Sequence, residues 1–288
     1  MKVGLVDVDS KIPNLALMKL SAYHKAKGDQ VKMFDPLFDK PELIYASKIF
    51  KSSDDFNYYP DCTCYKGGSG YDLEKKLPKV VEEKYPDYSL YNIDYAMGFT
   101  SRGCIRNCGF CIVPQKEGRW EAVSDIHSFW NGQKQLMLLD NNLTADNEHF
   151  TKVVKQLIKH KIKTDFSQGL DIRLIDDDKA KLLSKVRLWK QIHFAFDSVN
   201  DEQVVRQGIE TLLRHMPPSR LMFYVLIGWD SDESEDLYRL DLLRSYKIDP
   251  FVMPFDRTVE YQRKFARWVN MKAIFKTVAW PDYGKGGQ

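Results

Sequence analysis

Cysteine is scarce in this 288-residue sequence, which contains only five, and no stretch of it is a long apolar run. Three of the five cysteines stand close together, which indicates a ligand cluster in a reducing compartment rather than a disulfide framework. Without an apolar run of about 20 residues, no transmembrane helix is expected. Residues 1–5 open a strand pattern rather than a signal peptide. We therefore expect a cytoplasmic protein that has no membrane partner.

An excess of charge of one sign is also lacking. The 43 Lys and Arg residues nearly balance the 40 Asp and Glu residues, which leaves a net charge of +3. Proteins that depend on nucleic acid typically present a strongly basic surface, so nucleic acid is not expected to be required. The remaining composition is ordinary for a globular enzyme, and the length suits one large domain with a small partner domain.

The three clustered cysteines, Cys104, Cys108 and Cys111, have the spacing C-x3-C-x2-C directly after residues 94–100, which read as a buried strand. Three thiolates can hold three irons of a [4Fe–4S] cluster and leave the fourth iron open to a small molecule. Zinc is the alternative, but a structural zinc site uses four ligands, and no histidine follows Cys111 until His127. The spacing therefore favours an iron–sulfur cluster over zinc.

This loop resembles the signature of the radical S-adenosylmethionine superfamily, including the aromatic Phe110 before the last cysteine. The resemblance implies that Cys104, Cys108 and Cys111 ligate a [4Fe–4S] cluster and that S-adenosylmethionine binds the open iron beside Phe110. It further implies that reduction cleaves the cofactor to a 5'-deoxyadenosyl radical, which takes a hydrogen atom from the substrate. An external one-electron donor, such as a flavodoxin or ferredoxin, is then an expected partner.

Residues 1–90 are predicted to form a small N-terminal Rossmann-like α/β lobe with its linker. Strands are expected at residues 3–9, 30–35 and 42–47, and a helix opens at Pro13-Asn14 and ends at Gly28. In relatives such a lobe can bind cobalamin through Asp-x-His-x-x-Gly, but residues 7–12 contain neither histidine nor glycine. Cobalamin is therefore not expected.

Residues 91–260 alternate apolar strands with helical patterns, which predicts an α/β fold, a partial (β/α)6 TIM-like barrel. Residues 261–288 are read as a C-terminal extension. In such barrels the chemistry lies in the loops at the carboxyl ends of the strands. The six expected strands are residues 95–100, 135–139, 164–167, 191–196, 221–227 and 250–254.

Several residues at these strand ends are predicted to bind the cofactor. Asp140 resembles the acid that accepts hydrogen bonds from the cofactor amino group, although a turn before a helix would also explain it. Arg173 is suited to hold the cofactor carboxylate as a two-pronged donor, with a surface ion pair as the alternative. Asp197 is suited to a pair of ribose hydroxyls. Leu226 and Ile227 partly resemble the strand whose backbone contacts adenine.

Carboxylates and amides near the same ends suit the donor edge of a purine-like base. Three runs, residues 13–19, 166–174 and 267–270, resemble those shared by a compact group of bacterial and phage proteins. That group includes queuine lyases of deazapurine salvage, which split queuine and release 7-aminomethyl-7-deazaguanine. This resemblance implies a small deazapurine base as the substrate. The rivals are a radical enzyme that modifies bases in a nucleic acid, and a structural or sensing iron–sulfur or zinc protein. The predicted substrate residues are Asp9, Asn14, Asn141, Gln168, Asp171 and Asp256.

Two further features are interpreted as structural. Cys62 and Cys64 are too few for a second cluster, and this argues against a methylthiotransferase, which by resemblance needs three amino-terminal cluster cysteines. The glycine-rich run at residues 66–71 matches neither a P-loop nor a dinucleotide fingerprint, so a tight loop is expected there.

Overall fold

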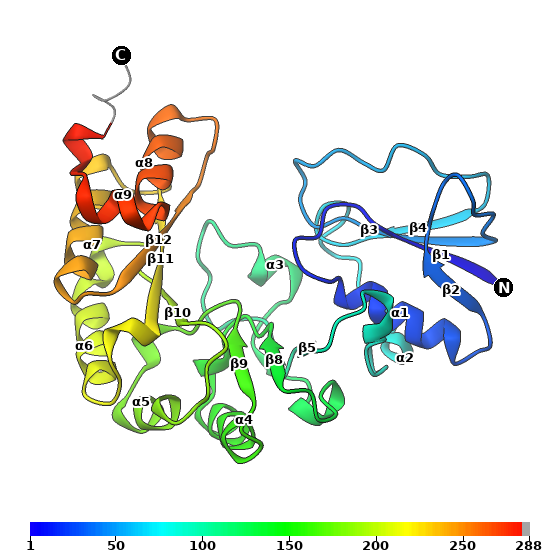
Figure 1. Cartoon of the computed structure of the whole chain (residues 1–288), viewed down its shortest axis with the longest axis horizontal. Coiled ribbons are helices and arrows are strands. Elements are labelled where there is room, and N and C mark those ends of the chain that lie inside the picture. The colour runs from blue at the N-terminus through cyan, green and yellow to red at the C-terminus, as the bar shows by residue number, and fades with distance from the viewer. Residues whose placement is uncertain (284–288) are drawn as a thin grey trace. The chain divides into compact units, whose positions relative to one another are not determined.

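The computed structural model describes residues 1–283 as an α/β protein with mostly parallel sheets (Figure 1). Contacts within the chain divide it into two compact units. The first comprises residues 1–107 and 111–137, and the second comprises residues 108–110 and the chain from 138 onward. The first unit therefore contains the predicted N-terminal lobe together with most of the cysteine loop.

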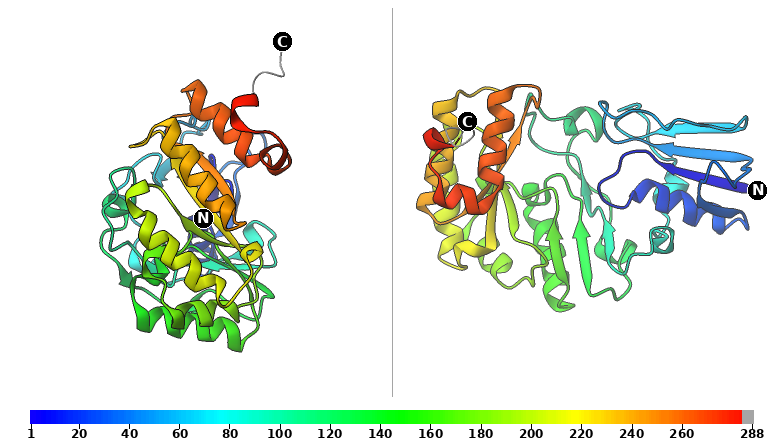
Figure 2. Two further views of the ribbon diagram at one scale, coloured as in Figure 1. Left: turned by 90° about the vertical axis from the view of Figure 1, so that its left-hand side faces the viewer. Right: turned by 45° about the horizontal axis from the view of Figure 1, so that its top comes forward.

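The first unit is built on a parallel sheet of order β2-β1-β3-β4, with α1 along one of its faces (Figure 2). The strands and the helix predicted for the lobe are confirmed. The elements of the first unit are β1 (Lys2–Asp7), α1 (Leu15–Lys25), β2 (Gln30–Met33), β3 (Leu43–Ser47), β4 (Thr63–Gly67), α2 (Lys79–Glu82), β5 (Ala96–Gly98), β6 (Ser101–Arg102), α3 (Val113–Lys116) and β7 (Glu121–Ala122), and β8 (Gln135–Leu138) ends with one residue of the second unit.

Successive residues of β1 point to opposite faces of this sheet, and apolar residues pack on both faces. Val3 and Leu5 pack with apolar residues of α1, whereas Val6 packs on the other side with residues of β3. Strand β4 was not predicted. It is an edge strand with exposed positions such as Tyr65, so it lacks the apolar run by which buried strands are recognised.

The second unit continues the alternation of strands and helices, and the six strands predicted between residues 95 and 254 are confirmed. β10, β11 and β12 form one parallel sheet. The elements are α4 (Asn147–Lys159), β9 (Lys163–Phe166), α5 (Asp177–Ser184), β10 (Ile192–Ala195), α6 (Glu202–Leu213), β11 (Leu221–Ile227), α7 (Glu233–Ser245), β12 (Asp249–Pro254), α8 (Glu260–Asn270) and α9 (Lys272–Thr277).

The described residues do not join β9 to β10 by a ladder. An isolated bridge links Thr164 of β9 to Leu188, which lies before β10. The parallel α/β architecture is thus observed, and the partial barrel stays a prediction. Within the extension predicted at residues 261–288, α8 and α9 are formed, and residues 284–288 lie outside the described residues.

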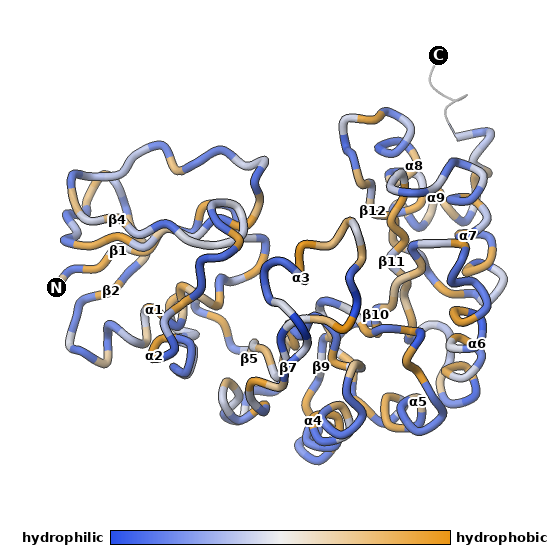
Figure 3. Tube along the Cα trace, turned by 180° about the vertical axis from the view of Figure 1, so that it is seen from behind, coloured by the Kyte–Doolittle hydropathy of each residue, from blue (hydrophilic) through white to orange (hydrophobic). Residues whose placement is uncertain are grey.

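The β10-β11-β12 sheet has two unlike faces. One face carries fully buried residues such as Phe194, Phe223 and Val252. On the other, which we call the open face, Phe251 and Met253 stay exposed. Figure 3 shows these strands as an apolar stretch and the neighbouring helices as mixed in polarity. By strand register and alternation the open face comprises His193, Ala195, Met222, Tyr224, Leu226, Asp249, Phe251 and Met253.

Across residues 1–283, no helix combines the length and the apolar character that crossing a bilayer would require.

Candidate functional site at the strand ends and the cysteine loop

The base of the cysteine loop is fixed within the first unit. β6 pairs with β7, and the amide of Cys104 donates a hydrogen bond of 3.3 Å to the carbonyl of Gly118. Gly103 has φ of +72°, and a Cβ there would lie 2.3 Å from the carbonyl oxygen of Arg119. Only glycine tolerates both this conformation and this approach. The antiparallel pair therefore closes the loop between residues 103 and 119.

The three cysteines of the loop are accessible to different degrees. Cys104 and Cys108 are half-buried, and Cys111 is exposed. No three His, Cys, Asp or Glu side chains among residues 1–283 lie close enough to hold a metal ion. The ligand prediction therefore depends on the donor chemistry and on the short loop that carries it. Three unoxidised thiols on one closed loop fit the ligand set of an iron–sulfur cluster.

Residues 108–110 of the loop belong to the second unit, where they meet Trp229. The ring of Phe110 lies 6.1 Å from that of Trp229, edge to face, and Trp229 lies 4.6 Å from Phe255. A Cβ at Gly109 would lie 3.1 Å from the Trp229 ring. Trp229 and Phe255 are nonetheless exposed. The predicted cofactor residue Phe110 thus contacts Trp229, which in turn contacts Phe255. Trp229 lies after β11 and Phe255 lies directly after β12.

Arg173 lies in a network of ion pairs after β9. Its Nε is 2.7 Å from Oδ1 of Asp171, and its Nη1 is 3.2 Å from Oδ2 of Asp201. Burial opposes the charge of Arg173, but Asp171, Asp201 and the thiolate of Cys108 together raise the pKa of its guanidinium. Arg173 therefore brings positive charge to the cysteine loop. The ion pair that the sequence analysis gave as the alternative for Arg173 is present. It joins Arg173, a predicted cofactor residue, to Asp171, a predicted substrate residue.

The residues that follow β8 are buried in the second unit. Asp140 is only 3% exposed, and it lines an enclosed gap with Phe166 and Leu170 that has no room for a water molecule. Asn142 accepts a hydrogen bond from Thr144, whose hydroxyl in turn accepts one from the amide of Asp171. The predicted substrate residue Asn141 is partly exposed beside them. These contacts tie the ends of β8 and β9 together.

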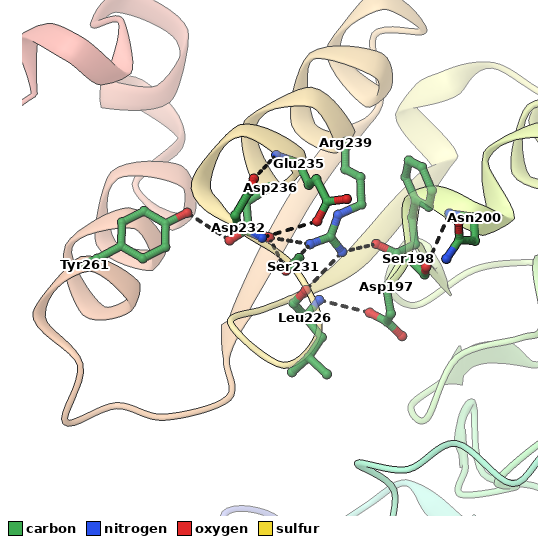
Figure 4. Close-up of polar contacts among 11 residues, drawn as sticks. Asp197, Ser198, Asn200, Leu226, Ser231, Asp232, Glu235, Asp236, Arg239 and Tyr261 are labelled. Carbon is green, nitrogen blue, oxygen red and sulfur yellow. Dashed lines mark hydrogen bonds and ion pairs between the residues drawn. The ribbon is translucent and has the colours of Figure 1, made fainter.

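Asp197 connects the ends of β10 and β11, because its Oδ1 accepts a hydrogen bond of 2.9 Å from the amide of Leu226 (Figure 4). Burial raises the pKa of the Asp197 carboxyl. The amide of Leu226 and the charges of Arg239 and Arg173 lower this pKa, but the effect of burial is larger. The carbonyl of Leu226 accepts from Arg239, and that of Ile227 accepts from Phe255. Both backbone groups of Leu226 that were predicted to contact adenine therefore have protein partners.

A buried ion pair on α7 contacts the residues at these strand ends. Arg239 and Asp236 are fully buried on α7, and Arg239 also donates to the carbonyls of Phe196 and Leu226. The hydroxyl of Tyr261 on α8 donates to the second oxygen of Asp236 (Figure 4). Arg239 thus fixes the carboxyl ends of β10 and β11 to α7, and Asp236 links the pair to α8 through Tyr261.

The two substrate residues predicted in the lobe have local partners. Asn14 caps α1 by accepting from the amide of Leu17, and its side-chain amide donates to the hydroxyls of Ser10 and Ser47. Asp9 accepts hydrogen bonds of 2.7 and 2.8 Å from the amides of residues 49 and 50. They lie together at the carboxyl end of the lobe sheet, where they hold loops in place.

The two remaining predicted substrate residues lie on the surface of the second unit. Asp256 follows β12 and accepts hydrogen bonds from the amide and the hydroxyl of Thr258, which lower the pKa of its carboxyl. Gln168 is exposed in the turn after β9. Asp256 therefore has the geometry of a turn-forming aspartate.

Cys62 and Cys64 pack in an apolar cluster of the lobe with Phe56 and Tyr59. Burial raises the pKa of both thiols, with Asp61 adding to the effect at Cys62. In the parallel register Cys64 lies opposite Ile44, three residues from the carboxyl end of the sheet. At 3.3 Å per residue this places Cys64 about 10 Å from the edge where parallel sheets bind ligands.

The glycine-rich run forms a tight loop, as predicted. Gly68 has φ of +95°, and a Cβ there would lie 2.4 Å from the carbonyl oxygen of Lys48. A Cβ at Gly70 would lie 2.6 Å from the Lys48 side chain. The glycines are therefore explained by the close approach of residue 48.

Sequence reasoning assigned no role to three polar residues in or beside the open face. Asp165 is a buried carboxylate in β9, and His193 and Tyr224 lie near it on β10 and β11. A signal was available, because Asp165 is a charged residue between apolar neighbours inside a short strand. Charged side chains are almost never fully buried unless they are paired, so such a position is informative.

Comparisons with known proteins place this chain near methylthiotransferases. No family model matches it. It is 25% identical over 220 residues to a tRNA-2-methylthio-N(6)-dimethylallyladenosine synthase of Sulfurihydrogenibium sp. (strain YO3AOP1), a match that covers 67% of this chain and 45% of that enzyme. The synthase of the same name from Aquifex aeolicus (strain VF5) is 22% identical over 176 residues, with 51% and 40% of the two chains covered.

A second kind of relative is the ribosomal protein uS12 methylthiotransferase RimO of Pseudomonas aeruginosa, 25% identical over 118 residues that cover 38% of this chain and 24% of that enzyme. The chain thus spans less than half the length of the curated relatives it matches. These relatives are radical S-adenosylmethionine enzymes that use [4Fe–4S] clusters and S-adenosylmethionine.

Proposed function

We propose that this chain is a radical S-adenosylmethionine enzyme whose cluster ligands are Cys104, Cys108 and Cys111. The observation that carries the proposal is the C-x3-C-x2-C loop, closed at its base by β6 and β7 and followed by alternating strands and helices. The similarity to two kinds of radical methylthiotransferase supports it. When bound, a reduced [4Fe–4S] cluster supplies the electron that cleaves S-adenosylmethionine to a 5'-deoxyadenosyl radical.

The residues of the chain then bind and orient the cofactor at the carboxyl ends of a partial (β/α)6 barrel, residues 91–260. Phe110 offers a ring face, and Arg173 places positive charge beside Cys108, where it favours the anionic cluster and the cofactor carboxylate. Asp197 is positioned by Leu226 to receive ribose hydroxyls. Asp140, Leu226 and Ile227 complete the proposed cofactor set, with residues 1–90 as an accessory lobe and 261–288 as an extension.

The finer assignment that we propose is cleavage of a small deazapurine base of the queuine type. Its support is the sequence resemblance together with the near-neutral charge and the purine-suited polar groups on the chain. The substrate residues in this proposal are Asn141, Gln168, Asp171 and Asp256 in the second unit, with Asp9 and Asn14 in the lobe. An external one-electron donor, such as a flavodoxin or ferredoxin, would reduce the cluster.

A second candidate is methylthio transfer to tRNA, which the name of the matched synthase favours. Such enzymes need further cluster cysteines in the amino-terminal part, and this sequence contains only Cys62 and Cys64 before Cys104. Burial in an apolar cluster raises the pKa of both thiols, which disfavours the thiolate that a cluster requires. These observations weigh toward a single cluster and against methylthio transfer.

The test is anaerobic reconstitution with iron and sulfide, followed by S-adenosylmethionine, dithionite and one candidate substrate at a time. Deoxyadenosine and products are followed by mass spectrometry. With queuine we expect a sharp rise in deoxyadenosine and release of 7-aminomethyl-7-deazaguanine. A rise with unmodified tRNA and a methylthio product would select the second candidate, and absence of cofactor cleavage with every substrate would reject the superfamily assignment.

A further inference from the structure

Lys48 is a buried lysine at the carboxyl end of the lobe sheet, directly after β3. The residue is only 8% exposed, and its ammonium makes no hydrogen bond or ion pair with any residue between 1 and 283. Charged side chains are almost never buried to this extent without a partner, because removal of a charge from water is costly unless another group compensates it. The ammonium of Lys48 is therefore a donor for which the described residues supply no acceptor.

The charged groups around Lys48 are already held by other partners. The carboxylate of Asp9 accepts hydrogen bonds from two backbone amides, and the charge of Lys48 acts on it without an ion pair between the two. Lys66 lies beside the ring of Tyr71, and its Nζ atom is 2.7 Å from a carboxylate oxygen of Asp55. The Nζ atom of Lys48 lies 5.7 Å from the centre of the same ring. Lys66 thus uses its charge locally, whereas Lys48 does not.

The glycine-rich loop after β4 packs on this lysine. The amide of Lys48 donates to the carbonyl of Gly67, and the carbonyl of Lys48 accepts from the amide of Gly70. A Cβ at Gly70 would lie 2.6 Å from Cγ of Lys48, so the absence of a side chain lets the loop close on the stem of the lysine. The Nζ atom still contacts solvent. The stem is therefore fixed by packing, while the ammonium stays accessible to a ligand.

Lys48 also lies at a position where open parallel sheets bind ligands. β1 continues through α1 to β2 on one side, whereas β3 and β4 lie on the other side of β1 (Figure 1). The connections thus diverge between β1 and β3, and ligands bind outside the carboxyl ends of the strands at such a point. An ammonium held there suits an anion, and lysine binds phosphate groups as a point charge.

We propose that Lys48 and the glycine-rich loop, residues 67–70, form a binding site for a phosphate group at the carboxyl end of the lobe sheet. The ammonium of Lys48 donates to the phosphate oxygens. Ser69 lies in the same loop, and its amide and hydroxyl donate to no residue between 1 and 283. Inorganic phosphate and a phosphorylated sugar share this chemistry. The inference goes beyond the proposed function, because binding at this site requires neither the cluster nor S-adenosylmethionine.

The test is calorimetric titration of the reconstituted full chain with inorganic phosphate and with ribose 5-phosphate, at constant ionic strength. Both should bind the wild type. Lys48→Met should weaken both by about tenfold or more, which is the value of one hydrogen bond to a charged group. The matched control Lys51→Met, at an exposed position three residues later, should bind like the wild type. Tighter binding of ribose 5-phosphate would identify an organic phosphate as the ligand, and equal affinities would identify phosphate itself.

Two glycine variants separate a built site from general attraction to lysines. Gly70→Ala keeps every charge but places a methyl group against the stem of Lys48, so it should weaken both ligands. Gly67→Ala places the same methyl group where no atom lies within 4 Å, so it should bind both ligands like the wild type. Equal affinities of the two variants would mean that the ligands are attracted by charge alone, and the proposal would be wrong.

Urea unfolding without phosphate distinguishes a ligand-binding lysine from a structural one. Lys48→Met should be at least as stable as Lys51→Met, because it replaces an uncompensated charge in a buried place with an apolar side chain. A clear loss of stability in Lys48→Met relative to Lys51→Met would assign Lys48 to the framework of the lobe and overturn the proposal. Absence of binding in the wild type, or unchanged binding in Lys48→Met, would overturn it as well.

Discussion

The lobe sheet of the first unit and strand β9 of the second unit both carry polar side chains, but the partners of these side chains differ. In the lobe, Asp9 receives two backbone amides, and Asn14 makes three hydrogen bonds within its own unit. In the second unit, Asp165 is more deeply buried and receives none from the described residues. A polar residue at a sheet becomes a site candidate only after its partners are counted.

Burial of charge alone does not distinguish the two cases. Arg239 is as deeply buried as Asp165, yet its terminal nitrogens are directed at Asp236, Ser231 and two backbone carbonyls. Such a guanidinium is part of the framework. Asp165 differs because, among residues 1–283, its one ionic contact is with Lys190, whose side chain is 52% exposed.

The largest expected effect concerns the cysteines of the two regions. Cys108→Ala should remove the absorbance of the reconstituted cluster and the cleavage of S-adenosylmethionine, because the loop then has two thiolates. The double variant Cys62→Ala/Cys64→Ala should retain both, since those thiols pack in the apolar cluster of the lobe. Iron content, visible absorbance and deoxyadenosine yield measure the outcome.

The double cysteine variant also decides between one cluster and two. Iron per chain that falls by about half in Cys62→Ala/Cys64→Ala would place a second cluster in the lobe and revive the methylthiotransferase candidate. A full cluster spectrum in Cys108→Ala would remove that cysteine from the ligand set.

The next prediction compares how much a buried ion pair of the second unit and a helix cap of the first unit contribute to the free energy of unfolding. Arg239→Met leaves Asp236 buried without its cation, which costs about 3–5 kcal/mol of unfolding free energy. Asn14→Ala removes the cap of α1, which costs about 1 kcal/mol. Urea unfolding followed by circular dichroism should therefore rank Arg239→Met well below Asn14→Ala in stability. Equal losses would mean that the buried pair contributes little more than a helix cap.

Most of the fold was accessible from the sequence because its strands are apolar and its helices are periodic. The six strands from residue 95 to 254 were located by such runs, and α1 by Asn14 at its start and Gly28 after its end. The edge strand β4 was missed, since its exposed residues give no apolar run. Closure into a barrel could not be decided, because it depends on contacts between strands far apart in the sequence.

The sequence predicts which polar residues follow the strands, but it does not predict the partners of their side chains. The strand-end rule found Asp171, Arg173 and Asp197, which do lie in linked networks. It could not show that Arg173 engages Asp171 or that Asp9 binds amides, because the partner of a side chain is set by tertiary packing. Asp165 was counted among the polar residues that face an interior site, but it was given no role, since it lies within β9 rather than after it.

The smallest effect is a pH dependence of opposite sign in the two units. Burial raises the pKa of Asp197, so the protonated form is favoured in the fold, and its stabilising contribution is lost as pH rises through the raised pKa. Although partial burial raises the pKa of Asp9, the amides of Ile49 and Phe50 and the charge of Lys48 lower it overall. Its contribution is therefore present above pH 3.8 and is lost as pH falls.

Substitution by asparagine should reveal these signs in urea unfolding between about pH 2 and pH 7, a range that includes the fall of the Asp9 contribution below pH 3.8. Asp197→Asn should gain stability relative to the wild type as pH rises, because asparagine keeps the acceptor for Leu226 and has no charge to bury. Asp9→Asn should lose stability relative to the wild type as pH rises, because only the wild type gains the carboxylate that the two amides and Lys48 stabilise. If both variants change in stability relative to the wild type in the same direction as pH rises, the pKa values of Asp9 and Asp197 are shifted in the same direction. The contrast between the hydrogen-bonded Asp9 and the buried Asp197 would then be wrong.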